Sequence, residues 1–143
     1  VIRAFVVGVA VFLVTTMFTD IPVYNMWLVV LITFLTSFLF STAGFINAVY
    51  AKSFDDINIV TTFVLTPLTY LGGTFYSIDA LPQVWQDISV FNPIAYIISS
   101  YRFAFLGLEE TSLALSLSIV VVLMIVLFFV ALMILSKGIG IKN

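Results

Sequence analysis

Cysteine and histidine are both absent from the 143-residue sequence, and only 8% of the residues are charged. Without cysteine, the chain has no disulfide framework and no thiolate metal site. Without histidine, it lacks the most common catalytic base and metal ligand. We therefore expect no metal site and no cofactor bound by this chain. An intramembrane enzyme made from these residues would need a pair of Asp or Glu side chains at depth, and no such pair lies inside an apolar run.

Apolar residues, in contrast, are abundant. They make up 63% of the sequence, and the mean hydropathy is +1.27. One soluble core cannot bury so much apolar surface, so the chain needs lipid as its solvent. We predict an all-α fold, a polytopic helical membrane protein whose partners include the lipid bilayer and no nucleic acid.

Four apolar stretches approach or exceed the roughly 20 residues that a helix needs to cross a bilayer. We predict transmembrane helices at about residues 1–18, 26–51, 57–75 and 113–135. The chain begins with Val, and the first run has neither the charged start nor the cleavage site of a signal peptide. We therefore expect residues 1–143 to be the C-terminal part of a longer membrane protein.

Small residues recur at helical spacing in the first two runs. Ala4 and Gly8 are four residues apart, which lets another helix approach closely. In the second run, small residues follow one another every three or four positions, at Thr33, Ser37, Ser41, Gly44 and Ala48. We interpret this strip as a helix-packing face, and a substrate-lining face is the alternative.

The third run combines a polar face with a helix breaker. Thr62, Thr66 and Thr69 fall on one helical face. Pro67 removes a backbone donor and should kink the helix, with Thr66 available to satisfy the freed carbonyl. The Gly72-Gly73 pair then loosens or ends the helix. This pattern is compatible with a moving or pathway-lining helix and also with structural packing.

A polar loop, Lys52 to Asp56, precedes this run. Ser53-x-x-Asp56 resembles a capping box, and Asp55 or Asp56 favours a helix N-terminus. We interpret the loop as the cap of the third run. A docking surface for a soluble partner is compatible with the same residues.

Residues 76–110 form a broken, re-entrant or interfacial region. Pro82 fits the first position of a short amphipathic helix, with Gln83, Gln86 and Asp87 facing away from its apolar side. Asn92-Pro93 breaks the chain before a second short helix at 93–106. Its 14 residues reach about 21 Å, less than the bilayer core of about 30 Å.

Arg102 lies near the end of this second short helix, where a charge needs a partner or access to water. Glu109 and Glu110 follow closely and are the expected partners, with Asp79 and Asp87 as alternatives. An arginine that simply extends to the membrane interface is the other interpretation.

The basic residues predict the orientation. Four alternating spans place four of the five basic residues on one side, namely Arg3, Lys52, Lys137 and Lys142. The positive-inside rule makes this side, including the C-terminus, cytoplasmic. Residues 76–110 are then external.

The stretch TPLTYLGGTFYSIDALP, a Trp-Gln pair and FNPIAYIISSYRFAFLG together resemble the permease subunits of ABC transporters of the second exporter type. In that family a Pro, a small-Gly pair and a Phe in the fifth helix are followed by Leu-Pro, and then by Asn-Pro before a short helix that ends in Arg. The corresponding positions here are Pro67, Gly72-Gly73, Phe75, Leu81-Pro82, Asn92-Pro93 and Arg102.

The resemblance implies a six-span permease in the cell membrane, of which the four predicted spans are the third to sixth. It also implies an external re-entrant pair of short helices, and two permeases that pair as a homodimer or with a related chain. Separate ATPase subunits would bind ATP and Mg, and the sequence indeed has no GxxxxGK[ST] run.

The function that follows is the translocation pathway of an ATP-driven exporter of drugs, lipids or polysaccharides. Candidate pathway or gating residues are Thr62, Thr66, Pro67, Thr69, Gly72, Gly73, Asn92, Pro93 and Arg102; candidate residues near the ATPase are Lys52, Asp55 and Asp56. The alternatives are a structural scaffold and a secondary transporter or channel that needs no ATPase. A secondary transporter usually couples to ions through an intramembrane acid or base, which the four runs lack at their centres.

Overall fold

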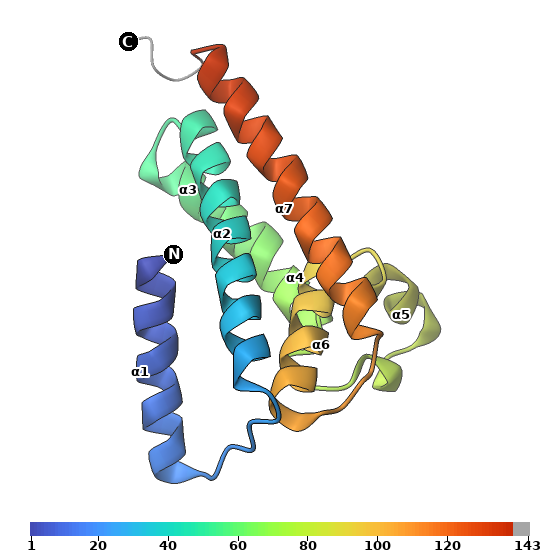
Figure 1. Cartoon of the computed structure of the whole chain (residues 1–143). Helices are drawn as coiled ribbons and strands as arrows, with labels where there is room; N and C mark the ends of the chain where they lie inside the picture. The colour runs from blue at the N-terminus through green and yellow to red at the C-terminus, as the bar shows by residue number, and fades with distance from the viewer. Residues whose placement is uncertain (139–143) are drawn as a thin grey trace.

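The computed structural model describes residues 1–138, which form helices and turns with no strand among them. In chain order the elements are α1 (Ile2–Phe18), α2 (Met26–Tyr50), α3 (Phe54–Val60), the π turn η1 (Thr61–Leu65), α4 (Thr66–Leu71), the 3-10 turn η2 (Ile78–Ala80), α5 (Gln83–Ser89), α6 (Pro93–Leu106) and α7 (Leu113–Ser136). Figure 1 shows α2 and α7 as long helices on either side of the shorter α6. The all-α prediction is confirmed for the described residues.

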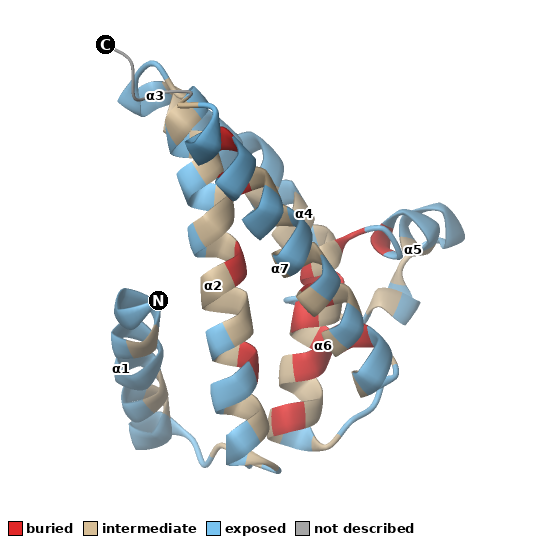
Figure 2. Cartoon of the chain, turned by 45° about the horizontal axis from the view of Figure 1, so that its top comes forward, coloured by how far each residue is buried: buried red, intermediate tan, exposed pale blue. Residues whose placement is uncertain are grey.

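The core of the bundle lies where α2, α6 and α7 meet. Leu39, Ile97 and Val120, one from each helix, are buried together. The short helix α6 holds the largest share of buried residues, as the red segments of Figure 2 show. Helix α6 therefore lies at the centre of the bundle, whereas the sequence predicted a re-entrant or interfacial segment and did not indicate that it would form the core.

Two helices, α2 and α7, are long and apolar enough to cross a membrane. The first predicted span is shorter, with 17 residues in α1. The third is helical over residues 54–71 but is divided into α3, η1 and α4. This helix begins three residues before the predicted start, at the Ser53 cap, and it ends four residues before the predicted end, at the glycine pair.

The division of the third span lies directly before Pro67. A proline ring collides with the carbonyl four residues earlier in a regular α-helix. Here the π turn Thr61–Leu65 precedes it, and the backbone N–H of Thr66 reaches back five residues to the Thr61 carbonyl. The Thr66 hydroxyl also donates to Thr61 O, at 3.2 Å, and not to the carbonyl that Pro67 frees. The chain absorbs the proline by widening one turn.

Only the first part of the small-residue strip of α2 contacts a helix among residues 1–138, where the Tyr101 hydroxyl of α6 donates to Thr33 Oγ1. For the rest of the strip the packing interpretation stays a prediction. Ser41, Gly44 and Ala48 are exposed, and a Cβ on Gly44 would meet nothing within 4 Å. The face of α2 that packs against α6 and α7 carries larger residues, including the buried Ile32 and Leu39. The residue pattern of α2 alone does not show which of its two faces packs against α6 and α7.

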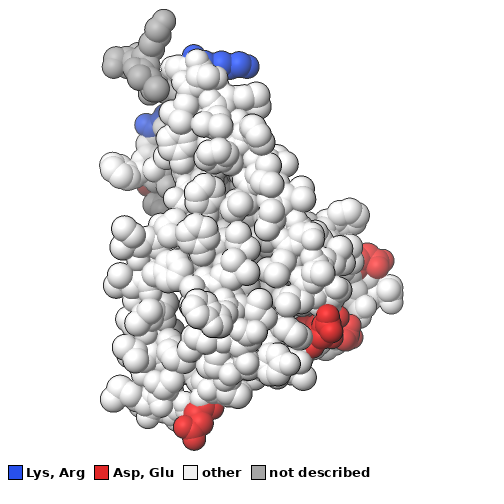
Figure 3. Space-filling view, viewed as in Figure 1, with Lys and Arg blue, Asp and Glu red and all other residues white. Residues whose placement is uncertain are grey.

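Most basic side chains that Figure 3 shows lie at one end of the molecule, and most acidic ones lie away from that end. Figure 3 shows Lys and Arg at the end where α2 and α7 finish, and most visible Asp and Glu at the other end or beside α5. Lys52 and Lys137 follow α2 and α7, whereas Glu109 and Glu110 precede α7. Lys142 and the last residues of the predicted basic tail lie outside the described residues.

Candidate functional site

Helix α4 ends inside the bundle, at the glycine pair. The Gly72 N–H donates to the Thr69 carbonyl at 3.3 Å, and Gly73 has a φ of +83°, which an L side chain rarely adopts. A Cβ on Gly72 would meet the side chains of Ile98 and Ile94 at 3.0 and 3.1 Å. Both glycines are therefore required locally, one for the turn and one for the close approach of α6. The ending leaves α4 with carbonyls that need donors from elsewhere.

Asn92 satisfies one of these carbonyls and begins α6 with the same side chain. It is 2% exposed, and its Nδ2 donates to the Leu68 carbonyl at 2.6 Å. Its Oδ1 accepts from the Ile94 N–H at 3.0 Å, which is an N-cap, and Pro93 takes the first helical position. The predicted break at Asn92-Pro93 is confirmed, and it ties α4 to α6.

Hydroxyl groups satisfy the other carbonyls of the last turn of α4. Ser89 Oγ of α5 donates to Leu71 O at 3.0 Å, and Tyr76 OH donates to Tyr70 O at 2.7 Å. Thr74 Oγ1 donates to Thr69 O at 2.9 Å. With Asn92, every carbonyl from 68 to 71 has a donor. Where water is scarce, the backbone carbonyls at the end of a helix need hydrogen-bond donors from the protein itself.

Arg102 closes the same site from the far end of α6. Its Nη1 donates to both carboxylate oxygens of Glu110, at 2.8 and 2.9 Å. Its Nη2 donates to the Gly73 carbonyl and, at 3.4 Å, to the Tyr76 carbonyl. The predicted pairing with a following glutamate is confirmed for Glu110. Arg102 thus joins the turn after α4 to the loop before α7.

The other acidic residues that were predicted as partners of Arg102, namely Glu109, Asp79 and Asp87, do not pair with it among the described residues. Glu109 Oε1 accepts from the Leu113 N–H at 3.3 Å and so contributes to the start of α7. Asp79 lies in η2 and Asp87 in α5, and neither forms an ion pair with Arg102 in the described part of the chain. Arg102 is therefore engaged by one carboxylate and two carbonyls.

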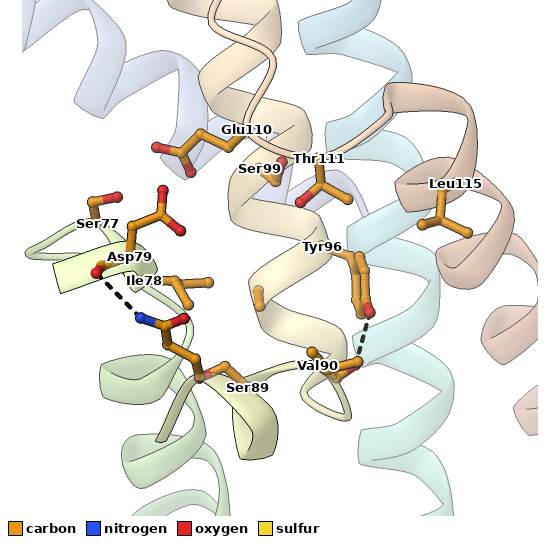
Figure 4. A pocket seen from close by; sticks show the side chains of 12 residues that line it. Ser77, Ile78, Asp79, Ser89, Val90, Tyr96, Ser99, Glu110, Thr111 and Leu115 are labelled. Atoms are coloured by element: carbon orange, nitrogen blue, oxygen red, sulfur yellow. Dashed lines mark hydrogen bonds between the residues drawn. The ribbon is translucent and has the colours of Figure 1, made fainter. Parts of the chain in front are cut away.

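A small polar pocket of about 220 Å³ adjoins this ion pair. Figure 4 shows the carboxylates of Asp79 and Glu110 on one side of it and Ser99 of α6 between Glu110 and Thr111. The side chain of Glu110 is therefore shared between the pocket wall and Arg102. The pocket is large enough for a few water molecules.

In helix α5, one polar side chain that was predicted to face outward points toward the preceding turn. The Gln86 side chain turns inward and donates to the carbonyls of Asp79 and Leu81, at 3.2 and 2.8 Å. The apolar side chains of Val84, Trp85 and Ile88 are exposed. The expected amphipathic helix exists, but Gln86 does not face away as predicted because backbone carbonyls of the preceding turn need its amide donors.

The predicted pathway residues fall into two groups. Gly72, Gly73, Asn92, Pro93 and Arg102 come together where α4 meets the α5–α6 pair. Thr62, Thr66, Pro67 and Thr69 lie along η1 and α4. The first three are exposed, and the Thr69 hydroxyl donates to Leu65 O of its own helix at 2.8 Å. The structure therefore brings the glycine pair, Asn92 and Arg102 into one site, to which the threonine face is adjacent.

The loop before α3 forms the predicted capping box. The Asp56 N–H donates to Ser53 Oγ at 3.3 Å, and Asp56 Oδ2 accepts from the Ser53 and Lys52 N–H groups at 3.1 and 2.9 Å. The capping interpretation is confirmed, and Asp56 is occupied by it. Lys52 and Asp55 are exposed, and a docking role for them stays a prediction.

Two contacts of the site were not predicted. Ser89 was not singled out, although a small hydroxyl residue three positions before Asn92 could have indicated a second donor toward α4. The Tyr101 hydroxyl donates to Thr33 Oγ1 at 2.9 Å and so joins α6 to α2. No local pattern could indicate this contact, because 68 residues separate Tyr101 from Thr33.

Comparisons with known proteins identify the family. The family model described as ABC-2 type transporter matches residues 1–106. The chain belongs to the ABC-2 type transporter family. This membership confirms the family resemblance carried by the glycine pair and the Asn-Pro break.

Individual relatives agree with this membership. The chain is 42% identical to the inner membrane transport permease YadH of Escherichia coli K12 over 141 residues, 99% of this chain and 55% of YadH. It is 29% identical to Nodulation protein J of Rhizobium leguminosarum bv. viciae over 112 residues, 76% of this chain and 43% of the relative. The chain thus spans about half the length of the curated relatives that it matches. No solved structure matches it.

Proposed function

We propose that the chain is part of the permease subunit of an ATP-driven ABC exporter in the cell membrane. Membership of the ABC-2 type transporter family supports a transport permease. The single structural observation that carries the proposal is the end of α4, where Asn92, Ser89 and Arg102 donate to partly buried backbone carbonyls. Broken helices of this kind suit a protein that must rearrange within lipid.

In this proposal α1, α2, the divided 54–71 helix and α7 are the four spans, and α5–α6 form a re-entrant pair. Phe91 and Pro93, at the turn of the pair, line an apolar pocket with Val122 and Val126 of α7. Val122 lies nine residues into α7, so this turn is about 14 Å along the helix axis from the start of α7. The turn is therefore at a depth that only lipid or protein can surround.

The charges support one orientation. Lys52 and Lys137 mark the end of the bundle that we assign to the cytoplasm, by the positive-inside rule. The C-terminus is then cytoplasmic, and the α5–α6 pair with its ion pair is external. The loop with Lys52 and Asp55 lies on the cytoplasmic side, where separate ATPase subunits would bind ATP and Mg.

The mechanism assigns distinct roles to the two groups of residues. ATP binding in the partner can shift the helices only if it favours one arrangement over another. The end of α4 is the joint at which such a shift meets the external pair, and Arg102 with Glu110 holds this joint closed. The threonine face of η1 and α4, exposed here, would line the pathway between two paired permeases.

An ATPase-independent secondary transporter or channel is the alternative. Such transporters usually couple through an acid or base inside a span. The only acidic residues in the four proposed spans are Asp55 and Asp56, in the first turn of the 54–71 helix, and none lies near the centre of a span. This favours the ATPase-dependent function.

The proposal is tested by co-expressing the full-length protein with candidate ATPase subunits and purifying the permease through an affinity tag. We expect one ATPase to co-purify in equal amount, in a complex whose mass requires two permeases. A permease that purifies without any ATPase from every co-expression would contradict the proposal.

A further inference from the structure

The polar pocket beside the ion pair adjoins the apolar pocket at the turn of the α5–α6 pair. The polar pocket lies at the start of α7, with Glu110 and Thr111 in its wall. The apolar pocket, of about 430 Å³, is lined by α7 over residues 118–126, which is about 12 Å along the helix axis. Val90 and Tyr96 line both pockets. The two spaces therefore follow one another along α7, from its outer end toward the depth that we assign to lipid.

The polar pocket carries more negative than positive charge. Figure 4 shows the carboxylates of Asp79 and Glu110 on the same side of it. Arg102 pairs with Glu110, whereas Asp79 is exposed and forms no ion pair among residues 1–138. No Lys or Arg lines the pocket in the described part of the chain. Two neighbouring carboxylates with one guanidinium leave a negative charge without a partner, so the pocket favours a cation.

Ser99 of α6 adds a buried hydroxyl that has no partner. The residue is 7% exposed and lines the polar pocket. Its Oγ forms no hydrogen bond within the residues that the structure describes, and Figure 4 shows it between Glu110 and Thr111. The hydroxyl of Ser116 is also unpartnered but wholly enclosed, whereas that of Ser99 is open to the pocket. Since buried hydroxyls normally have partners, Ser99 indicates a bound group that donates a hydrogen bond.

The apolar pocket makes no such demand on an occupant. Its two polar side chains are used within the protein, since Tyr96 OH donates to Val90 O at 2.7 Å and Ser118 Oγ donates to Ala114 O at 2.6 Å. The other residues of its lining are apolar, namely Val90, Phe91, Pro93, Ile119, Val122, Leu123 and Val126. A hydrocarbon chain suits this lining, because it gains from burial and needs no hydrogen bond.

A hydrogen-bonding cation joined to a hydrocarbon chain matches both pockets. We propose that the two pockets together bind a membrane phospholipid with a primary-amine headgroup. Its ammonium group lies between Asp79 and Glu110 and donates to Ser99 Oγ, and one acyl chain follows α7 through the apolar pocket. The bound ammonium compensates the charge of Asp79 beside the Arg102–Glu110 pair. The proposal rests on the placement of α5–α6 in the outer part of the membrane, but binding of the lipid needs neither an ATPase nor transport.

The test measures lipid binding to the full-length permease, purified in detergent without an ATPase, by native mass spectrometry. The probes are three lipids with the same palmitoyl and oleoyl chains and different headgroups. Phosphatidylethanolamine carries the primary ammonium, phosphatidylcholine a cation that donates no hydrogen bond, and phosphatidylglycerol no cation. We expect phosphatidylethanolamine to bind about tenfold more tightly than phosphatidylglycerol, as one charge-assisted hydrogen bond allows. Phosphatidylcholine should lie between them.

Variants separate the two pockets. Asp79→Asn and Ser99→Ala should each remove most of the preference for phosphatidylethanolamine. Val122→Trp, which fills the apolar pocket, should weaken the binding of all three lipids alike. Asp87→Asn in α5 and Ile125→Trp in α7 are the matched controls and should change nothing, because both residues are exposed and line neither pocket.

Equal binding of the three lipids by the unaltered permease would overturn the proposal, and so would an unchanged preference in Asp79→Asn. Binding of ethanolamine alone as tightly as phosphatidylethanolamine would assign the polar pocket to a soluble amine. A second measurement uses thermal unfolding, because a ligand stabilises the folded state that binds it. Phosphatidylethanolamine should raise the unfolding midpoint of the unaltered protein more than phosphatidylcholine does, and Ser99→Ala should lose this difference. An equal response of both proteins would also contradict the proposal. None of these outcomes depends on whether an ATPase drives the permease, which co-purification tests separately.

Discussion

Asn92 shows how one side chain can stabilise two helix ends. Its side-chain Nδ2 donates to the Leu68 carbonyl in the last turn of α4, and its side-chain Oδ1 caps the first turn of α6. An N-cap contributes about 1 kcal/mol, and a buried carbonyl left without a donor costs about 1–3 kcal/mol. In membranes such contributions fall toward the lower values, because other partners are found in the unfolded reference state.

We therefore expect Asn92→Ala to destabilise the full-length protein by about 2 kcal/mol. Asn58→Ala is the matched control, since Asn58 is an exposed residue of α3. Thermal unfolding of both variants in detergent measures the difference. Equal stability of the two variants would show that the Asn92–Leu68 bond contributes nothing to the joint between α4 and α6.

Arg102 acts at the same joint through charge. Removing its guanidinium leaves Glu110 without its partner and the Gly73 carbonyl without a donor. Arg102→Ala should therefore lower transport about tenfold or more, while the amount of co-purified ATPase stays unchanged. The tenfold loss corresponds to about 1.4 kcal/mol, close to the lower end of the roughly 1.5–3 kcal/mol that a hydrogen bond to a charged group contributes.

Two further variants make this prediction specific. Glu110→Gln keeps the bonds from Arg102 to the carbonyls, so transport should fall less than in Arg102→Ala. Arg102→Lys keeps the charge but loses the planar fork that reaches three groups at once, so it should rescue only part of the activity. Unchanged transport in Arg102→Ala would exclude the closing role of the ion pair.

At the scale of elements, the divided helix 54–71 is the least regular part of the bundle. The π turn Thr61–Leu65 exists directly before Pro67, and such turns often occur at functional sites. Pro67→Ala tests whether the proline causes the π turn, because alanine restores the backbone N–H and removes the ring.

Pro67→Ala should convert the π turn to regular α-helix. We expect the amides of residues 63–66 to exchange hydrogen at least about tenfold more slowly, since an interior proline costs about 3 kcal/mol or more. Transport should fall if the wide turn is used during rearrangement. Pro82→Ala, at the cap of α5, is the control that should leave exchange in this segment unchanged. Unaltered exchange in Pro67→Ala would show that the sequence around η1, and not the proline, makes the turn.

Local chemistry predicted some elements well and tertiary packing decided the others. The bounds of α6 followed from the Asn92-Pro93 start and from Gly107, which has a φ of +69°. The strip at Ser41 and Gly44 was assigned to packing, yet it remains exposed, because its spacing says nothing about which neighbour is present. Gln86 turned inward because nearby carbonyls, invisible in a helical projection, need donors.

The candidate site was predictable to the same extent. Arg102, Asn92 and the glycine pair stood out because a charge, an Asn-Pro break and a double glycine are costly within apolar sequence. That they meet at one place depends on the position of α6 in the core, which no local pattern indicated. The Arg102–Glu110 pair could be predicted from the sequence because the two residues are only eight positions apart.

At the scale of the whole molecule, the orientation makes a prediction that needs no knowledge of substrate. The 143 residues contain no cysteine, so single cysteines can be labelled selectively once any others are removed. In intact cells, a membrane-impermeant maleimide should label Asp20→Cys and Asp87→Cys but label Asp55→Cys only after the membrane is opened. The reverse pattern would place the α5–α6 pair in the cytoplasm and contradict the assignment.

If ATP hydrolysis in a partner drives this permease, the two proteins should show it when they are reconstituted together. The full-length protein and its co-purified ATPase are reconstituted in liposomes, and ATP hydrolysis is compared with that of the ATPase alone. We expect faster hydrolysis in the complex, a rate that changes with Arg102→Ala, and no response to dissipation of the ion gradient. A permease that leaves hydrolysis unchanged, and that moves solute only when an ion gradient is imposed, would instead be a secondary transporter.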